Sequence, residues 1–150
     1  MKLKSKLGYL FLLCLWVGMS TSMAQNITHE GREFWVTFPR HEPNGSVLAT
    51  MKLFITAKAD SKGMIKVGTD IIPFTVRANK TTAVDIPRSL TYLSHSGYFS
   101  GRAIQVLVNP DEPQVVVHAH INASARSAAT LVLPVESLGS GYYVMGYDQH

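Results

Sequence analysis

The sequence predicts an all-β protein, an antiparallel β-sandwich that is preceded by a signal peptide and is incomplete at its C-terminal end. Three observations support this prediction. From Gln25 onward, 13 Val, 8 Ile and 10 Thr stand against 8 Leu, and β-branched side chains favour sheet over helix. Apolar and polar residues alternate within short segments. Turn-forming residues separate these segments, which is typical of sandwiches.

Residues 1–24 are predicted to be the signal peptide. Three lysines precede an apolar run over residues 7–19, and Ser22-Met23-Ala24 places small residues at positions −3 and −1 of a cut after Ala24. The run is too short for a membrane span, which needs roughly 20 apolar residues, and no later stretch is long enough either. We therefore expect a mature chain, residues 25–150, that is secreted or held at the cell surface.

Removal of the leader also removes most of the net charge. The whole chain has 14 Lys+Arg against 10 Asp+Glu, a formal charge of +4; three of the basic residues lie in the leader, which leaves eleven against ten, or +1. A chain with a net charge of +1 is not strongly basic, and it therefore lacks the excess of Lys and Arg that a nucleic-acid-binding surface requires. Cys14, the only cysteine, also lies in the leader, so the mature chain has neither a disulfide nor a thiol nucleophile.

The first half of the mature chain contains a series of predicted strands. They are residues 34–38, 51–59, 64–69, 71–77 and 81–87. Asp60-Ser61-Lys62-Gly63 and Ala78-Asn79-Lys80 are predicted to be hairpin connections between neighbouring strands. Residues 88–102 are predicted to form a loop, with one helical turn around residues 89–93.

Further strands follow a break at residues 109–113, where two prolines remove backbone donors. The alternation continues over residues 115–122 and around Leu131 and Leu133. Tyr142–Tyr147 is a last apolar segment close to the C-terminus, and this position predicts a domain that continues beyond the sequence. Twelve side chains are expected to face the core: Phe34, Val36, Leu53, Ile55, Phe74, Val76, Val84, Ile86, Ile104, Val106, Val117 and Leu133.

No pattern of a known catalytic chemistry is present, and no cofactor is predicted. The mature chain lacks a Gly-x-Ser-x-Gly elbow, a phosphate loop and a dinucleotide glycine motif. His118 and His120 form a His-x-His pair on one face of a predicted strand. Zinc needs a third and usually a fourth ligand, and nothing in the sequence brings His95 or Asp111 close. An ordinary solvent-facing strand is therefore the simpler interpretation of these histidines.

Trp35 is the candidate for partner binding. It falls on the opposite strand face from Phe34 and Val36, and exposed Trp is over-represented in binding hot spots. The more common role of a tryptophan at such a position is to pack under a loop or against a second sheet, and this is the interpretation that the sequence favours. Glu33 and Asp85 are carboxylates without a partner at a telling spacing, and Asp85 is expected to form a turn hydrogen bond at a strand end.

Several segments, taken in order, are similar to one protein family. They are residues 31–38, 53–57, 81–87, 103–106 and 131–139, followed by Tyr142-Tyr143-Val144. This series resembles the amino-terminal domain of the IgG Fc-binding protein family over most of residues 30–147. Its most specific piece is the Leu-Pro-x4-Leu-Gly-x2-Tyr-Tyr segment. The resemblance implies an extracellular β-rich binding module, as in bacterial secreted and surface relatives, with no known catalytic set; it assigns no binding residue.

These observations predict a secreted or cell-surface binding or adhesion module without catalytic activity. Its partner would be an extracellular protein or a glycan. Two alternatives stay open: a structural β-module that carries other domains, and a metal-dependent enzyme that uses His118 and His120. An exposed apolar patch would favour binding and a fully polar surface the structural role, whereas a third metal ligand beside the histidines would favour the enzyme.

Overall fold

The structure of the chain is a computed structural model that describes residues 28–40, 48–93, 97 and 100–141. Its strands confirm the predicted all-β class. The predicted signal peptide and the predicted strand Tyr142–Tyr147 lie outside the described residues, as does His95.

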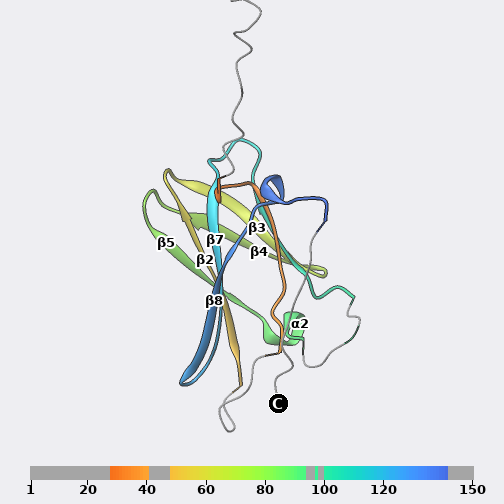
Figure 1. Ribbon diagram of the computed structural model, residues 1–150. Helices are drawn as coiled ribbons and strands as arrows, with labels where there is room; N and C mark the ends of the chain where they lie inside the picture. The colour runs from red at the N-terminus through yellow and green to blue at the C-terminus, as the bar shows by residue number, and fades with distance from the viewer. Residues whose placement is uncertain (1–27, 41–47, 94–96, 98–99, 142–150) are drawn as a thin grey trace, which may run out of the picture.

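Eight strands and two short helical turns make up the described elements (Figure 1). The strands are β1 (Glu33–Val36), β2 (Thr50–Ala57), β3 (Ser61–Val67), β4 (Asp70–Val76), β5 (Thr81–Ile86), β6 (Ile104–Val108), β7 (Val115–Ala123) and β8 (Arg126–Val132). The turns are α2 (Arg88–Thr91) and the 3-10 turn η1 (Val135–Ser137). The helical turn predicted around residues 89–93 is thus confirmed within a residue or two.

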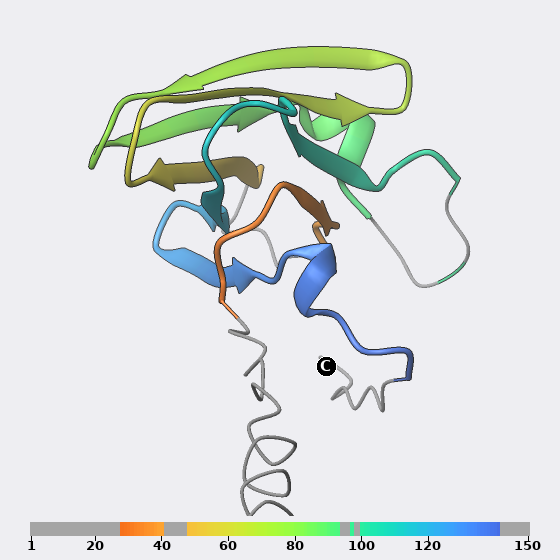
Figure 2. The ribbon, with the colours of Figure 1, turned by 90° about the horizontal axis from the view of Figure 1, so that it is seen from above.

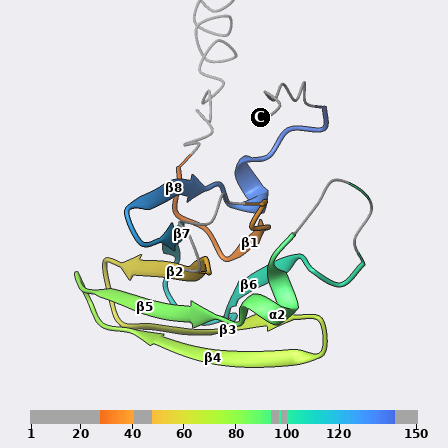
Figure 3. The ribbon, with the colours of Figure 1, turned by 90° about the horizontal axis from the view of Figure 1, so that it is seen from below.

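The strands form two four-stranded antiparallel sheets that pack face to face. Sheet I has the order β1-β6-β3-β4, and sheet II has the order β5-β2-β7-β8. Between the sheets, β4 contacts β5 and β1 contacts η1. Figures 2 and 3 show β4 and β5 on one side of the sandwich and β1 and η1 on the opposite side. The core lies between the two sheets because each strand turns every second side chain inward.

Nearly all of the side chains predicted to face the core do so. Val36 and Val84 are half-buried and pack against the core, but Leu133 is 47% exposed and its assignment was wrong. The register places Val132 opposite Val117 on β7, and Val132 is only 5% exposed. β8 itself shows no alternation of burial: residues 126–131 are all exposed and only Val132, at its end, is buried.

Both connections predicted to be hairpins pass instead from one sheet to the other. The chain leaves β2 in sheet II for β3 in sheet I, and it leaves β4 in sheet I for β5 in sheet II. The turn at residues 78–80 is present, with Asn79 at a φ of 56° and the Lys80 N–H donating to the Arg77 carbonyl at 3.0 Å. Turn-forming residues mark where a chain reverses, but they do not specify which sheet the next strand joins.

Gly63 belongs to β3 and not to the predicted turn. A Cβ atom at this position would collide with the Leu107 carbonyl oxygen and come within 2.6 Å of the Phe74 ring. Two residues earlier, the buried Ser61 hydroxyl donates to the Pro113 carbonyl at 2.8 Å. Glycine is needed at this position because the Phe74 ring and the backbone of β6 both approach β3 too closely to leave room for a side chain.

The two tight hairpins of the fold connect strands within one sheet. Gly68 and Thr69 join β3 to β4, and Ser124 and Ala125 join β7 to β8. Gly68 has a φ of 59° and Ser124 a φ of 56°, the positive values that two-residue hairpins favour. Among the described residues, no helix has the length and apolar character that a membrane crossing requires.

Candidate functional site

The outer face of sheet I carries Trp35 together with several other apolar side chains. We call this surface the Trp35 face; it consists of Glu33, Trp35, Met64, Lys66, Ile71, Pro73, Gln105 and Leu107. Trp35 is 49% exposed and Ile71 is 60% exposed. The water-facing side of an antiparallel sheet is ordinarily polar. Lys62 and Thr75 continue the same face of β3 and β4 in that way, whereas the positions named above include five apolar side chains.

The strand register arranges the Trp35 face in two rows that run across the strands. One row is Trp35, Gln105, Lys66 and Ile71, and the other is Glu33, Leu107, Met64 and Pro73. Each row spans three strand spacings, or about 14 Å. Two polar side chains therefore separate Trp35 from Ile71, whereas the second row is apolar apart from its end at β1.

Glu33 holds the Trp35 indole in place. The indole Nε1–H donates to Glu33 Oε1 at 2.9 Å, and the Gln105 Nε2 donates to the same oxygen at 2.6 Å. Residues 33 and 35 can meet because side chains two apart on a strand share a face. Trp35 thus does not pack under a loop or between sheets: it is tied to its own strand with half of its surface exposed.

His118 and His120 lie on the outer face of sheet II. His118 is exposed and His120 is half-buried, and the His120 ring packs edge-on against Phe54 with 5.8 Å between ring centroids. The residues opposite the two histidines on β2 and β8 are Phe54, Lys52, Leu131 and Ala129. These neighbours give the histidines apolar and cationic surroundings and supply no metal ligand.

A metal centre is not assembled by the part of the chain that the structure describes, where no three His, Cys, Asp or Glu side chains are grouped. Asp111, on the connection between β6 and β7, is accordingly not brought to the His118 and His120 pair. Asp85 does not form the expected turn hydrogen bond. It pairs with Lys52 across β5 and β2, with 2.9 Å between the Lys52 Nζ and Asp85 Oδ1.

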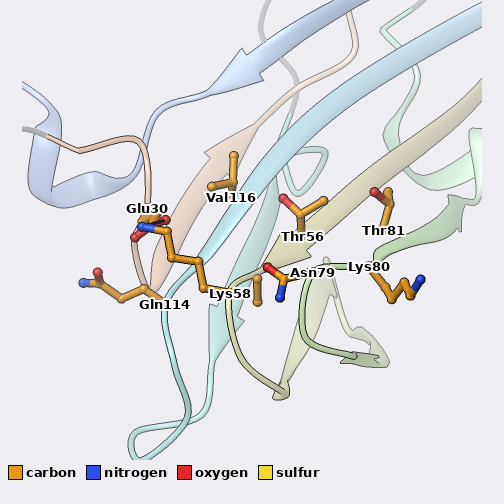
Figure 4. A pocket seen from close by; sticks show the side chains of 9 residues that line it. Glu30, Thr56, Lys58, Asn79, Lys80, Thr81, Gln114 and Val116 are labelled. Atoms are coloured by element: carbon orange, nitrogen blue, oxygen red, sulfur yellow. Dashed lines mark ion pairs between the residues drawn. The ribbon is translucent and has the colours of Figure 1, made fainter.

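A shallow hollow of about 300 Å³ lies where β2, β7 and the β4–β5 connection meet (Figure 4). Its lining residues are Glu30, Thr56, Ala57, Lys58, Asn79, Lys80, Thr81, Gln114 and Val116. The Lys58 Nζ and Glu30 Oε1 are 2.8 Å apart, and Lys80 points away from this pair in Figure 4. The hollow offers hydroxyl, amide and amine groups to water, but its lining has no histidine, no cysteine and no aromatic ring.

Gln105, Lys66 and Ile71 are members of the Trp35 face that the sequence analysis did not single out. One signal was available for Ile71: two apolar residues in a row, Ile71 and Ile72, mean that one of them faces outward. No such signal exists for Gln105, because its partner Glu33 is 72 positions away in the chain.

The comparisons with known proteins give no relative to set beside this geometry. No family model matches the chain, and searches of curated proteins and of solved structures find no match either. The functional argument therefore depends on the residues of this chain.

Proposed function

We propose that the protein is a secreted or cell-surface binding module without catalytic activity, and that it contacts its extracellular ligand through the Trp35 face. The observation that supports this most strongly is the half-exposed Trp35 on an outer sheet face that also carries Met64, Leu107, Ile71 and Pro73. Exposed apolar side chains that share one face with polar ones can mark an interaction site, and tryptophan is enriched among the residues that dominate binding energy.

Binding is favoured over a purely structural role because a module that only carries other domains needs no apolar outer face. In the row of Leu107, Met64 and Pro73, Pro73 is exposed and Leu107 and Met64 are half-buried, so part of this apolar surface is in contact with water. A tryptophan fixed by Glu33 further lowers the conformational entropy that a ligand must remove on binding.

A metal-dependent enzyme has no specific support. His118 and His120 supply two ligands where zinc sites use three or four, and the described residues add no third. The resemblance to the amino-terminal domain of the IgG Fc-binding protein family agrees with a binding role, but immunoglobulin itself remains one ligand among others to be tested.

Export is part of the proposal and has a direct test. If residues 1–24 are a signal peptide, mass spectrometry of the protein recovered outside the cytoplasm will show a chain that begins at Gln25. An intact Met1 on a protein confined to the cytoplasm would contradict the proposal.

Binding is tested with the exported protein on surfaces coated with immunoglobulin G, fibronectin or laminin and with soluble polysaccharides. We expect at least one of these ligands to be bound, and the double variant Trp35→Ala, Ile71→Ala to lose that binding. Leu131→Ala is the matched control, because Leu131 is an exposed apolar residue on the other sheet. Both variants must unfold cooperatively, near the wild-type midpoint. Binding that survives the double variant would overturn the assignment of the Trp35 face.

A further inference from the structure

We infer that the ligand of the Trp35 face is a neutral carbohydrate, with one sugar ring stacked on the Trp35 indole. This inference rests on the proposed function and narrows it to one class of ligand. It follows from three properties of the face: the fixed indole, the polar groups that adjoin it, and the length and charge of the rows across the strands.

The indole of Trp35 is a ready platform for a sugar ring. The face of an aromatic ring is negative, and the C–H groups on the apolar side of a pyranose are slightly positive, so the two attract in addition to burying apolar area. Because the Nε1–H already donates to Glu33 Oε1 at 2.9 Å, the ring is held before any ligand arrives. Such pre-organisation reduces the entropy cost of binding.

Polar groups of complementary kinds adjoin the platform. The Glu33 Oε2 and the Gln105 amide oxygen can accept hydrogen bonds, and the Lys66 ammonium can donate them. Within the described part of the chain, Lys66 forms no ion pair, and the hydrogen bonds of Glu33 go to Oε1 alone. Protein-binding hot spots are instead surrounded by contacts that exclude water, so polar side chains beside Trp35 favour a hydroxyl-rich ligand.

The shape and charge of the face indicate which carbohydrate fits. The row from Trp35 to Ile71 crosses about 14 Å of open sheet, which suits a short stretch of polysaccharide lying across the strands. The two rows carry one carboxylate, Glu33, and one ammonium, Lys66, so they have no net charge to attract an acidic sugar, and the carboxylate is the group that touches the indole. A neutral polysaccharide is therefore favoured over an acidic one.

Affinity gel electrophoresis of the exported protein tests the inference, with laminarin, galactomannan, xylan or the acidic hyaluronate cast in the gel. We expect at least one neutral polysaccharide to retard the wild-type protein, with a dissociation constant of about 0.1–1 mM for its oligosaccharides. Trp35 is the only tryptophan within residues 25–150, since Trp16 lies in the predicted leader. The same oligosaccharides should therefore change the intrinsic tryptophan fluorescence.

Four variants separate stacking from other causes of retardation. Trp35→Ala and Trp35→Leu should lose the retardation, Trp35→Phe should keep part of it, and Leu131→Ala should behave as the wild type. Retardation that survives Trp35→Ala, equal retention by the Leu and Phe variants, or retardation by hyaluronate alone would each overturn the inference. Absence of retardation in every gel would overturn it as well.

Failure of this inference can be told from failure of the proposed function. Suppose that one of the immobilised proteins is bound as well after enzymatic removal of its glycans, and that Trp35→Ala, Ile71→Ala abolishes this binding. The carbohydrate inference is then wrong, and the proposed function stands with a protein as ligand. If no protein and no polysaccharide is bound, both are wrong.

Discussion

Asp60 and Ala78 join the two connections at which the chain passes between the sheets. The Oδ1 of Asp60, just before β3, accepts a hydrogen bond from the Ala78 N–H, just after β4, at 2.7 Å. Beside it, the Asn79 N–H donates to the Ala57 carbonyl at 2.8 Å, and the Thr82 hydroxyl of β5 donates to the Thr75 carbonyl of β4 at 2.9 Å. This side of the sandwich is thus closed by hydrogen bonds, although β4 and β5 belong to different sheets.

Removal of the Asp60 carboxylate should loosen this side. We expect Asp60→Ala to lower the free energy of unfolding by about 1 kcal/mol, because the Ala78 N–H loses its carboxylate acceptor. The loss is no larger because Asp60 is exposed and water can replace the carboxylate. Denaturant unfolding measures this change. Asp70→Ala is the control, since Asp70 is equally exposed and its carboxylate has no interaction with a described residue; an equal loss in both variants would contradict the role of Asp60.

Gly63 should tolerate no side chain. Gly63→Ala places a methyl group against the Leu107 carbonyl oxygen and the Phe74 ring, so we expect a loss of about 2 kcal/mol or more, within the usual range for overpacking. Gly141→Ala serves as the control because a Cβ there meets nothing within 4 Å. Equal thermal midpoints for the two variants would show that β3 and β6 do not approach as closely as described.

The buried hydroxyl of Thr91 should contribute to the attachment of α2. It donates to the Pro87 carbonyl at 3.0 Å and lies 3.8 Å from the Met51 sulfur. Thr91→Val keeps the volume and removes the hydroxyl, and we expect a loss of about 1 kcal/mol in unfolding free energy. Thr75→Val, at an exposed position, should be close to neutral; a Thr91→Val protein as stable as the wild type would contradict the prediction.

Zinc should not stabilise the protein through His118 and His120. A bound ion stabilises the folded state by RT ln(1 + c/Kd), where c is the concentration of free ion, so weak binding adds little, and the two imidazoles have no third ligand among the described residues. We expect equimolar zinc and a chelator to give the same thermal midpoint. A rise with zinc that disappears in His118→Ala, His120→Ala would revive the metal-site hypothesis.

Alternation of apolar residues was enough to predict which strand faces form the core, because a sandwich buries one face of each strand. The alternation also placed Trp35 on the outer face of its strand, away from the core-facing Phe34 and Val36. It failed at Leu133, where β8 ends at Val132 and Pro134 pairs with Phe34 of β1. The pairing with the neighbouring strand decides which alternate side chains of a segment face the core. Two apolar residues, Leu131 and Leu133, next to Pro134 are too short a pattern to predict that choice.

The features that could not be predicted from the sequence depend on pairing between strands that are distant in the chain. The hairpin predictions were wrong because the same short turn serves a hairpin and a passage between sheets. Gly63 was assigned to a turn from its residue type alone. The close approach of Phe74, which explains a glycine inside β3, follows from the β3–β4 register and is not visible in the sequence. For the candidate site, the strand face of Trp35 was predicted but its exposure was not, and the shared oxygen of Glu33 requires β1 to lie beside β6.

The pairing of β1 with β6 also has a consequence for the order of events during synthesis. Glu33 and Gln105 are 72 residues apart, and a ribosome that adds about 5–20 residues per second needs roughly 4–14 s to cover that distance. During this interval Phe34 and Trp35 belong to a strand whose sheet partner does not yet exist. Until β6 has emerged, the nascent chain therefore exposes an unpaired apolar strand, which is a site where aggregation can begin.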